Sequence, residues 1–546
     1  MTKGDFMTEK LLTQLTTPAL SQPELFRPPL AYPDIAYDKM LTHSATHWPE
    51  NVAVVFRDSN ITFRELEALT NQFAHALQGL GVKQGERVCL FMTNRPEFVI
   101  SCYAITRIGA VFNAINPAYK EREIAYQLAD TEATAIIVQP ALLPLVEAVR
   151  DQGPSLKHVI SVGPGKSAEG PRHVRFAELI KGQPTTPLAV QISLSDLVAL
   201  PYSSGTTGLP KGVMLTHRNR VCNTMQFAAA MRIKENDRTL IFLPLYHIYG
   251  TALMECAMYT GASAVLMERF EPGECLRLIE QHRITLLYVA PPVLLALLAW
   301  PDLKKYDLSS IRYIMTAAAP LAPKVAQDFC QITGAKVLQA YGLTECGPSH
   351  LIPVYNDDLN VLESVGLPIS DTAQKVVDIE NGEQELAVGE VGEICIRGPQ
   401  VMQGYWKAPQ ETAIALRNGW LHTGDIGSID ANGYVFLQDR KKEMIKYKGF
   451  AIAPAELEVL LLEHPGVADV AVIGKPDDEA GEVPKAFVVR KADHPDLTAD
   501  ELVHFTAGRL ATYKTLREVE FIEAIPRVPS GKVLRRVLKE RELQKG

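Results

Sequence analysis

Short apolar runs alternate with amphipathic stretches over the first two thirds of the chain. The apolar runs predict strands, and they are Arg87–Phe91, Ala135–Val138, Thr239–Leu243, Ala264–Leu266 and Leu286–Val289. The amphipathic stretches predict helices, and they are Pro96–Arg107, Met254–Gly261 and Glu274–Gln281. Alternation of this kind is typical of a mainly parallel sheet covered by helices. We therefore expect an α/β fold whose large N-terminal domain is built from βα-layered subdomains.

The longest apolar run, Leu286–Trp300, does not predict a membrane span. Two prolines, Pro291 and Pro292, interrupt it, and it falls short of the roughly 18–20 apolar residues that a spanning helix requires. We expect a buried strand followed by a buried helix in this run, and no transmembrane segment in the sequence.

The pattern changes after about Glu390. Short β-rich runs such as Gly392–Arg397 are separated by turn residues, and Asn432-Gly433 between two apolar runs is a strong signal for a β-hairpin. We expect a small β-barrel-like part here. Beyond it, a charged segment at 439–442 precedes a stretch with its own βα pattern. These changes predict an N-terminal domain over residues 1–438, a hinge over residues 439–442 and a small, mobile α+β domain over residues 443–546.

Composition narrows the class of protein without changing this architecture. The 546 residues are 47% hydrophobic and 22% charged, as in soluble globular proteins. Lysine and arginine number 55 and aspartate and glutamate 63, so the net charge of −8 gives no reason to expect nucleic-acid binding. The 8 cysteines are scattered without a Cys-x-x-Cys pair, which predicts reduced thiols and a cytoplasmic location. Residues 1–22 lack the apolar core of a secretory signal, and we expect a frayed start.

One loop carries the residue types that bind phosphate. Residues 202–212 read Tyr-Ser-Ser-Gly-Thr-Thr-Gly-Leu-Pro-Lys-Gly. Glycines let backbone N–H groups approach an anion closely, and hydroxyl groups and a lysine add donors and positive charge. The spacing differs from that of a Walker A loop, because Lys211 is preceded by Pro210 and followed by Gly212. A plain surface linker is the alternative, but linkers rarely lie between strand-like runs, here 197–201 and 213–215.

Together with four later motifs, this loop resembles the acyl-adenylate-forming (AMP-binding) superfamily, in its acyl-CoA synthetase and 4-coumarate-CoA ligase-like branch. The later motifs are Tyr341-Gly342-Leu343-Thr344-Glu345, Thr423-Gly424-Asp425, the stretch from Asp439 to Gly449, and Pro529-Ser530-Gly531-Lys532. Five motifs in the same order over residues 202–532 make coincidence negligible. The resemblance implies two half-reactions. A carboxylate attacks the α-phosphorus of ATP to give acyl-AMP and pyrophosphate, and CoA then displaces AMP.

The resemblance also implies which residues bind ATP and AMP. Thr344 corresponds to the family's α-phosphate contact, Glu345 to its Mg²⁺ ligand and Asp425 to the acid that binds both ribose hydroxyls. Taken alone, Thr344-Glu345 equally fits a helix N-cap with its first-turn acid. The implied nucleotide residues are Ser203, Ser204, Gly205, Thr206, Thr207, Gly208 and Lys211 in the phosphate loop, Ala318, Ala319 and Tyr341 beside the adenine, and Gln339, Ala340, Thr344, Asp425, Arg440 and Lys532.

Lysines of the C-terminal part are implied in different steps. Lys532 carries an ammonium between the substrate carboxylate and the α-phosphate in the first half-reaction. Lys446 lies near the acyl-AMP, and Lys442 is the hinge about which the small domain rotates between steps. Lys448-Gly449 and Arg269 are implied in CoA binding, although Arg269 fits a simple surface charge as well. By composition alone, the cations around Lys446 would be a solvated face or a weak anion patch.

The acid is selected by a pocket whose residues vary between subfamilies. The implied residues are His247, Tyr249, Leu253, Ala317, Ala318 and Ala340, and His247 is also implied in catalysis. A lone histidine among apolar residues is more often a packed core residue, but the motif favours a pocket role here. Many relatives carry glycine where this chain has Ala317 and Ala340. Overfilling a pocket wall costs about 1–3 kcal/mol, which predicts a slim aliphatic or compact aryl acid over a bulky substituted cinnamate. Residues 244–250, around His247, contain no aspartate that could pair with the ammonium group of an amino acid. This absence disfavours an amino-acid substrate.

We therefore expect an ATP-dependent carboxylic acid–CoA ligase of the AMP-forming type, acting on a medium- or long-chain fatty acid or a compact aryl acid. The expected partners are ATP with Mg²⁺, the acid and CoA. An acyl-AMP ligase that loads a carrier protein and a luciferase-like oxygenase stay open within the superfamily. A non-catalytic nucleotide- or acyl-binding protein is the alternative outside it, against which the intact Lys532, Glu345 and Asp425 argue. A peripheral membrane contact and a homodimer also stay open.

Overall fold

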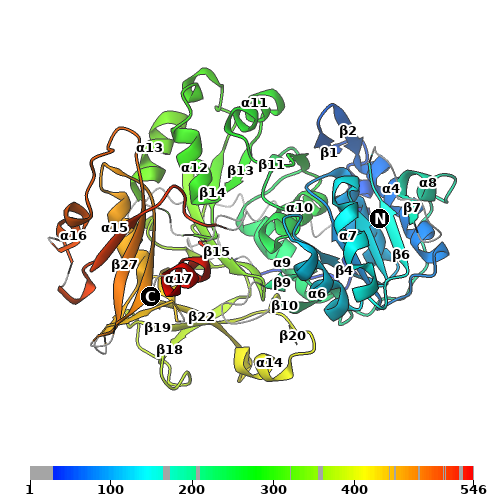
Figure 1. Ribbon diagram of the computed structural model, residues 1–546. Helices are drawn as coiled ribbons and strands as arrows, with labels where there is room; N and C mark the ends of the chain where they lie inside the picture. The colour runs from blue at the N-terminus through cyan, green and yellow to red at the C-terminus, as the bar shows by residue number, and fades with distance from the viewer. Residues whose placement is uncertain are drawn as a thin grey trace.

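The computed structural model describes residues 27, 29–163, 173–203, 210–319, 321, 323–354, 361–441, 443–447, 450–477, 480–507, 509–510, 512–527 and 533–544. The frayed start expected over residues 1–22 lies outside these residues. The described residues form a large N-terminal body around three sheets and a small C-terminal domain around a fourth (Figure 1). The mixed α/β class expected from the sequence is confirmed.

The first sheet carries most of the predicted site at one of its edges. Its nine strands run in the order β17-β16-β15-β14-β13-β11-β12-β1-β2. They are β1 (Val52–Phe56), β2 (Ser59–Thr62), β11 (Arg238–Ile241), β12 (Ser263–Leu266), β13 (Leu286–Val289), β14 (Tyr313–Thr316), β15 (Lys336–Leu343), β16 (Gly347–Leu351) and β17 (Leu367–Pro368). From β12 to β15 neighbouring strands are parallel. Parallel strands are buried on both faces, which explains why they stand out as continuous apolar runs.

The second sheet has nine strands in the order β20-β10-β8-β4-β3-β5-β6-β7, with β9 paired to β10. They are β3 (Arg87–Phe91), β4 (Val111–Ala114), β5 (Ala135–Val138), β6 (His158–Ser161), β7 (His173–Arg175), β8 (Leu197–Ala199), β9 (Tyr202–Ser203), β10 (Lys211–Thr216) and β20 (Gly404–Tyr405). The strands β4, β3, β5 and β6 are parallel. This sheet brings the two ends of the predicted phosphate loop together on β9 and β10.

Helices cover these two sheets, as the alternating pattern predicts. They are α3 (Lys39–His47), α4 (Phe63–Gly79), α5 (Pro96–Arg107), α6 (Glu121–Thr131), α7 (Leu143–Val149), α8 (Phe176–Ile180), α9 (His217–Ala230), α10 (Ile248–Thr260), α11 (Pro272–His282), α12 (Pro291–Leu298) and α13 (Pro323–Thr333). Among the described residues, every helix is too short or too polar to cross a lipid bilayer. All eight cysteines carry free thiols, and seven of them are buried, as expected.

The β-rich part expected after Glu390 is an antiparallel sheet of five strands. They are β18 (Ala373–Val377), β19 (Gly392–Arg397), β21 (Leu416–Arg417), β22 (Trp420–Ile429) and β23 (Val435–Arg440), and α14 (Pro409–Ala415) packs beside them. The predicted hairpin joins β22 to β23, but its loop spans residues 430–434 instead of two residues. The two-residue loop is Asn418-Gly419 between β21 and β22, where φ values of 52° and 77° fit a type I′ turn.

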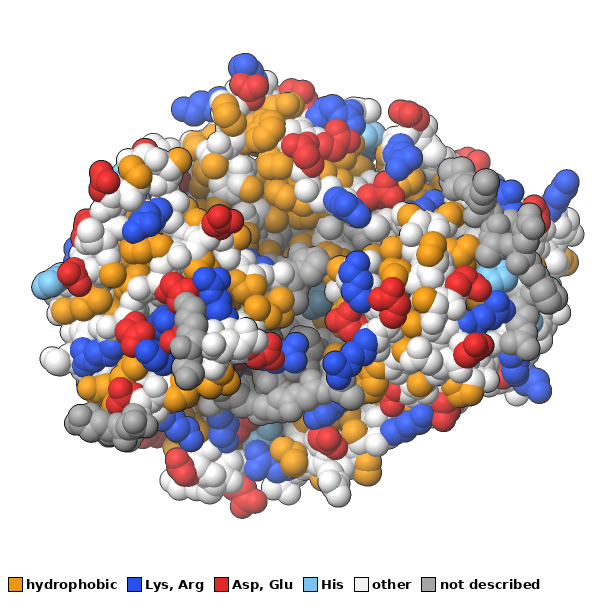
Figure 2. All heavy atoms as spheres, in the orientation of Figure 1, with side chains coloured by type: hydrophobic (Ala, Val, Ile, Leu, Met, Phe, Trp, Pro, Cys, Tyr) orange, Lys and Arg blue, Asp and Glu red, His pale blue; other side chains and the backbone are white. Residues whose placement is uncertain are grey.

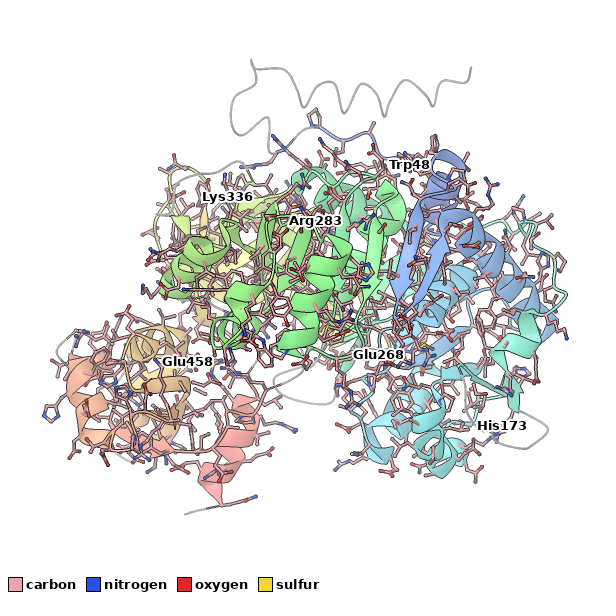
Figure 3. The ribbon with its side chains drawn as sticks, turned by 90° about the horizontal axis from the view of Figure 1, so that it is seen from above. Trp48, His173, Glu268, Arg283, Lys336 and Glu458 are labelled. Carbon is pink, nitrogen blue, oxygen red and sulfur yellow. The ribbon has the colours of Figure 1, made fainter. Side chains whose placement is uncertain are left out.

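The C-terminal domain forms a separate body beside the N-terminal one, and Figure 3 labels Glu458 within it. Its sheet consists of β24 (Ile445–Tyr447), β25 (Phe450–Ile452), β26 (Val467–Asp477), β27 (Gly481–Arg490) and β28 (Glu518–Phe521). Its helices are α15 (Pro454–Leu462), α16 (Ala499–Ala507) and α17 (Arg535–Leu543). The first two residues of the expected hinge, Asp439 and Arg440, still belong to strand β23 of the N-terminal body.

Two helix predictions need correction. The helix expected at 254–261 begins at Ile248, because Gly250 does not break it. A Cβ atom at Gly250 would lie 2.3 Å from the carbonyl oxygen of Pro244, so the glycine serves a close approach of two backbones. The helix expected to be buried after Pro291 is only half-buried. Leu294 and Leu297 face the core, whereas the side chains between them are partly exposed.

Candidate active site

The predicted site residues gather at the carboxyl ends of the parallel strands in the first sheet. His247 follows β11, Arg269 follows β12, Ala317–Ala319 follow β14, and Thr344-Glu345 follow β15. The chain moves from β11 outward to β12 and then returns to β13 on the other side of β11. Such a reversal opens a crevice beyond the strand ends, where α/β proteins bind their ligands. Figure 2 shows the molecule hollowed in the middle of this view, between the C-terminal domain and the lobe of the second sheet.

The loop between β11 and α10, with the first turns of α10, carries three of the predicted acid-pocket residues. His247 caps α10, since its Nδ1 accepts a hydrogen bond from the Tyr249 backbone N–H at 3.2 Å. This acceptor role leaves the proton of the neutral ring on Nε2. The Tyr249 hydroxyl donates to the carbonyl oxygen of Met315 on β14 at 3.2 Å, and burial raises the pKa of this phenol. Leu253, one turn further along α10, is buried.

Asn94 holds this loop, although no sequence motif identified this residue. Its side-chain amide donates to the carbonyl oxygens of Ile241 and Leu243 at 3.1 and 3.0 Å, and its oxygen accepts from the Leu245 N–H at 2.8 Å. Asn94 follows β3 of the second sheet, so it joins the two sheets beside His247. Glu268, which Figure 3 labels, makes a further link between the sheets, because it accepts a hydrogen bond from Thr93 at 3.2 Å.

Ala317 and Ala340 directly follow residues that are paired between β14 and β15. Thr316 lies opposite Gln339 in the parallel register, so Ala317, just after the end of β14, lies next to Ala340, which is inside β15. Ala340 is buried and Ala317 is half-buried. Ala318 has a φ of +75°, a left-handed conformation that is uncommon for alanine. The buried side chain of Gln339 donates to the backbone oxygens of Leu362 and Ser364.

Three residues from three strands form the predicted ribose contact. The Tyr341 hydroxyl donates to Oδ2 of Asp425 at 2.5 Å, and Nε of Arg440 lies 3.2 Å from Oδ1 of the same carboxylate. Asp425 is only 5% exposed and stands opposite Arg440 in the β22–β23 ladder. Burial, together with the neighbouring carboxylate, raises the pKa of Tyr341, so the phenol stays protonated and donates. The structure thus brings together residues that are far apart in sequence and that the motifs predicted.

Thr344 and Glu345 lie in the turn that joins β15 to the antiparallel β16. The alternative that they begin a helix is therefore wrong. Oε1 of the half-buried Glu345 accepts a hydrogen bond from the Tyr405 hydroxyl at 2.8 Å. The Tyr405 ring also lies 5.5 Å from the Lys211 ammonium, which is 3.6 Å from Glu411. Tyr405 thus links Glu345 to Lys211 of the phosphate loop, and the sequence motifs did not identify it.

The phosphate loop is described only at its ends. Ser203 pairs with Lys211 across β9 and β10, and the Tyr126 hydroxyl donates to the backbone oxygen of Pro210 at 2.8 Å. Ser204, Gly205, Thr206, Thr207 and Gly208 lie outside the described residues. Lys442, Lys448, Gly449 and Lys532 lie outside them as well. Lys446 is exposed on β24, and its backbone N–H donates to Glu482 at 2.8 Å. The side chain of Arg269 is exposed and makes no ion pair with the described residues.

The residues present fit the magnesium ion that accompanies ATP. No cluster of three or more His, Cys, Asp or Glu side chains that could hold a metal occurs in the described part of the chain. Magnesium bound with ATP needs no such cluster, because it takes one or two carboxylates and completes its shell with phosphates and water. Glu345 offers Oε2 for this purpose, since Oε1 is held by Tyr405.

Comparisons with known proteins point to one family. The AMP-binding enzyme family matches residues 41–406, and the AMP-binding enzyme C-terminal domain matches residues 456–532. The chain is 39% identical to 4-coumarate–CoA ligase 5 of Oryza sativa subsp. japonica over 492 residues, which cover 88% of this chain and 89% of the relative. It is 39% identical to 4-coumarate–CoA ligase of Pinus taeda, over 89% of this chain and 90% of the relative. The crystal structure of the anthranilate CoA ligase AuaEII with anthranoyl-AMP superposes with a TM-score of 0.86 and 30% identity, over 94% of this chain and 98% of that one.

Proposed function

We propose that this chain, which belongs to the family of AMP-binding enzymes, activates a compact aryl carboxylic acid. It is an acid–CoA ligase of the adenylate-forming branch of that family. The acid is joined to AMP first and transferred to CoA second. The observation that carries the adenylation step is the cluster of Tyr341, Asp425 and Arg440. Tyr341 directly follows Ala340, one of the predicted acid-pocket residues, on β15.

Asp425 is oriented to bind the ribose of ATP. Tyr341 donates to one carboxylate oxygen and Arg440 lies against the other, so the carboxylate is held in one orientation. Each oxygen keeps a lone pair that can accept a hydroxyl proton. The two ribose hydroxyl groups can therefore bind to the two oxygens together. Hydrogen bonds to a charged group are worth about 1.5–3 kcal/mol, enough to fix the nucleotide.

The phosphates are assigned to the loop between Ser203 and Lys211 and to Thr344 at the end of β15. Glu345, held by Tyr405, would ligate Mg²⁺, which neutralises phosphate charge when it is bound with ATP. We assign Lys532 to the space between the acid and the α-phosphate, where its ammonium would neutralise both anions. Positioning and charge neutralisation are then the main sources of catalysis.

The two half-reactions balance without a nucleophile from the protein. A carboxylate oxygen of the acid attacks the α-phosphorus, and the bond from that phosphorus to the oxygen bridging to the β-phosphate breaks, so that pyrophosphate leaves. The sulfur of CoA then attacks the acyl carbon, the bond between that carbon and the AMP oxygen breaks, and the thiol proton is lost. His247 faces the acid side of the site in this assignment, and Lys446 the acyl-AMP.

A compact aryl acid is the substrate class with the most support. The relatives named above are 4-coumarate and anthranilate CoA ligases, whose named acids carry an aromatic ring. Ala317 and Ala340 each add a methyl group directly after the paired residues Thr316 of β14 and Gln339 of β15. Overfilling a packed wall costs about 1–3 kcal/mol, so a ring with bulky substituents loses about ten- to a hundredfold in kcat/KM.

A panel of carboxylic acids tests the proposal. AMP formation is measured with ATP and CoA for 4-coumarate, benzoate and anthranilate, a dimethoxylated cinnamate, and saturated acids of increasing length. We expect the highest kcat/KM for an unsubstituted or singly substituted aryl acid. A preference for the dimethoxylated cinnamate contradicts the narrowed pocket, and a preference for long saturated acids contradicts the aryl class.

Two controls separate the remaining alternatives. A reaction without CoA, trapped with hydroxylamine, reports acyl-AMP formation. Acyl-AMP formation in this control, together with no acyl-CoA when CoA is supplied, would indicate another acceptor such as a carrier protein. Absence of both acyl-AMP and AMP with every acid would indicate a non-catalytic binding protein. The variant Ala317→Gly/Ala340→Gly should raise kcat/KM for the dimethoxylated cinnamate by about tenfold while changing 4-coumarate little.

A further inference from the structure

A buried carboxylate, that of Glu393, contacts the backbone directly before Asp425 of the predicted ribose contact. This residue lies on β19, in the middle of the antiparallel sheet, and is only 4% exposed. A buried carboxylate needs partners, because burial without them costs several kcal/mol. The hydrogen-bond and ion-pair partners of Glu393 therefore show which parts of the chain this residue connects.

The strand that carries Asp425 bulges where it passes Glu393. Glu393 pairs with Ile426 and Cys395 pairs with His422, so four residue steps on β22 face two on β19. Bulges of this kind leave backbone groups unpaired and turn a side chain in a new direction. The residue turned here is Asp425, which reaches Tyr341 and Arg440.

Glu393 supplies the partner that the bulge would otherwise lack. Its Oε1 accepts a hydrogen bond from the Gly424 N–H at 3.0 Å, directly before Asp425. Gly424 has a φ of +72°, a conformation that glycine adopts without strain. The Thr423 hydroxyl completes the bulge, because it donates to the Ile394 carbonyl at 2.7 Å and accepts from the Asp425 N–H at 3.1 Å.

The second oxygen of Glu393 faces the chain segment that leads to the C-terminal domain. Oε2 lies 3.3 Å from the ammonium of Lys441, the residue after Arg440. The backbone N–H of Lys441 also donates to the Gly424 carbonyl at 2.9 Å. Glu393, Gly424 and Lys441 thus form a closed ring of contacts, which we call the bulge clamp.

Two further groups near Oε2 of Glu393, Arg417 and His422, lie farther from it than Lys441 does. Arg417 lies 3.9 Å from Oε2, and it also donates to Nδ1 of His422 at 2.7 Å. His422 lies 3.7 Å from Oε2, and burial and the neighbouring Arg417 lower the pKa of its ring. His422 is therefore neutral near pH 7, so Lys441 and Arg417 are the cations that face the carboxylate.

We propose that Glu393 is a positioning residue that fixes the Asp425 bulge and the start of the domain connection together through the bulge clamp. This inference rests on the proposed role of Asp425 in ribose binding. Its consequence is that affinity for the nucleotide depends on where Lys441 lies, so a movement of the C-terminal domain that displaces Lys441 also loosens Asp425.

Steady-state kinetics of full-length variants test the bulge clamp. Glu393→Ala removes both contacts and should raise the KM for ATP about ten- to a hundredfold while changing the KM for the acid less than about threefold. Glu393→Gln keeps an acceptor for the Gly424 N–H but loses the ion pair with Lys441, so it should recover only part of this loss and leave the KM for ATP about three- to tenfold above that of the parent enzyme. Glu383→Gln, an exposed residue of the same sheet region, is the matched control and should change neither KM.

The ion pair is tested separately with Lys441→Met. Glu393→Gln and Lys441→Met each break the same pair, so the double variant should be no worse than the more impaired single variant. This comparison stays informative if Glu393→Ala does not fold. Additive effects overturn the coupling of the bulge to the connection.

A parallel Asp425→Ala variant distinguishes the two levels of the account. If it raises the KM for ATP and Glu393→Ala does not, the bulge clamp is overturned and the ribose site stands. If Asp425→Ala leaves the KM for ATP unchanged, the proposed ribose site falls and the inference falls with it. If Glu393→Ala raises the KM for ATP and the KM for the acid equally, and Glu393→Gln is as impaired as Glu393→Ala, then Glu393 has only a general structural role and the proposal is overturned.

Discussion

Asn94 holds the loop that carries His247, a residue that we assign to the acid pocket. Its amide group makes three hydrogen bonds to the loop between β11 and α10, whose backbone leads to His247. Asn94 is buried, so each lost bond would leave a backbone group without solvent to replace it. Asn94 follows strand β3 of the second sheet, whereas the loop that it holds follows strand β11 of the first sheet.

Replacing Asn94 should therefore affect the acid and spare the nucleotide. We expect Asn94→Ala to raise the KM for the acid about tenfold and to leave the KM for ATP within about twofold, because the Asp425 cluster does not depend on this loop. Asn94→Asp should be no better, since a carboxylate oxygen would then face the carbonyls of Ile241 and Leu243. Asn60→Ala on the exposed β2 strand is the control. Equal changes in both KM values would contradict the assigned role.

At the scale of elements, the end of β23 is where the C-terminal domain meets the N-terminal body. Oδ2 of Asp439 accepts from the Ala455 N–H in the first turn of α15 at 2.8 Å, and Oδ1 accepts from the Arg440 N–H at 2.7 Å. Arg535 of α17 pairs with Glu458 of α15 at 2.8 Å and lies close enough to favour the charged form of Asp439. Burial outweighs these partners and raises the pKa of Asp439 from 3.8 to about 6.

This raised pKa predicts a pH-dependent contribution to stability. Between about pH 4 and pH 6 the folded chain binds the Asp439 proton more tightly than the unfolded chain, so acidification favours the folded state in this window. Above pH 6 the charged carboxylate costs stability. Asp439→Asn lacks this titration and keeps an oxygen for Ala455. The Tm of the parent protein minus that of Asp439→Asn should therefore increase as the pH falls from 7 to 4. Parallel Tm curves would contradict the raised pKa.

The elements that could be predicted from sequence are those whose signal is local. Arg87–Phe91, Pro96–Arg107 and Leu286–Val289 were predicted with the bounds that the structure has, because buried parallel strands and amphipathic helices carry their pattern in consecutive residues. The start of α10 was missed because it is set by His247, whose side chain caps the helix, a contact that a pattern of apolar residues does not show.

The same distinction applies to the site. Tyr341, Asp425 and Arg440 were found because they lie in motifs, and the structure brings them into contact. Asn94, Glu393 and Tyr405 were missed because each acts on a residue that is distant in sequence, such as Leu245 at 151 positions from Asn94. No local pattern records such pairs. Residues 204–208 and Lys532 lie outside the described part of the chain, so their roles stay predictions.

At the scale of the whole molecule, two bodies share one site. The N-terminal body carries the residues that we assign to the acid pocket and to the ribose contact, and Figure 1 shows the C-terminal domain, from α15 to α17, packed beside it. The C-terminal domain supplies Lys446 and Lys532 from different segments. The proposed alternation uses these two lysines in turn, one for each half-reaction, on a nucleotide that stays bound to the N-terminal body.

Lysine variants test this division of labour. Lys532→Ala should lower acid-dependent pyrophosphate release by at least about a hundredfold and largely spare thioester formation from supplied acyl-AMP. Lys446→Ala should do the reverse, and Lys491→Ala, on an exposed lysine of the same domain, should change neither rate. Equal loss of both half-reactions in both variants would contradict the use of the two lysines in separate steps.

The central claim is that the acid is activated by bonding to the α-phosphorus of ATP, and oxygen labelling tests it most directly. The enzyme is supplied with ATP, CoA and an acid whose carboxylate carries ¹⁸O in both positions, and the products are analysed by mass spectrometry. One carboxylate oxygen stays on phosphorus when CoA takes the acyl group, so AMP should carry one ¹⁸O atom for each acyl-CoA formed. Unlabelled AMP, or label in the pyrophosphate, would contradict the account.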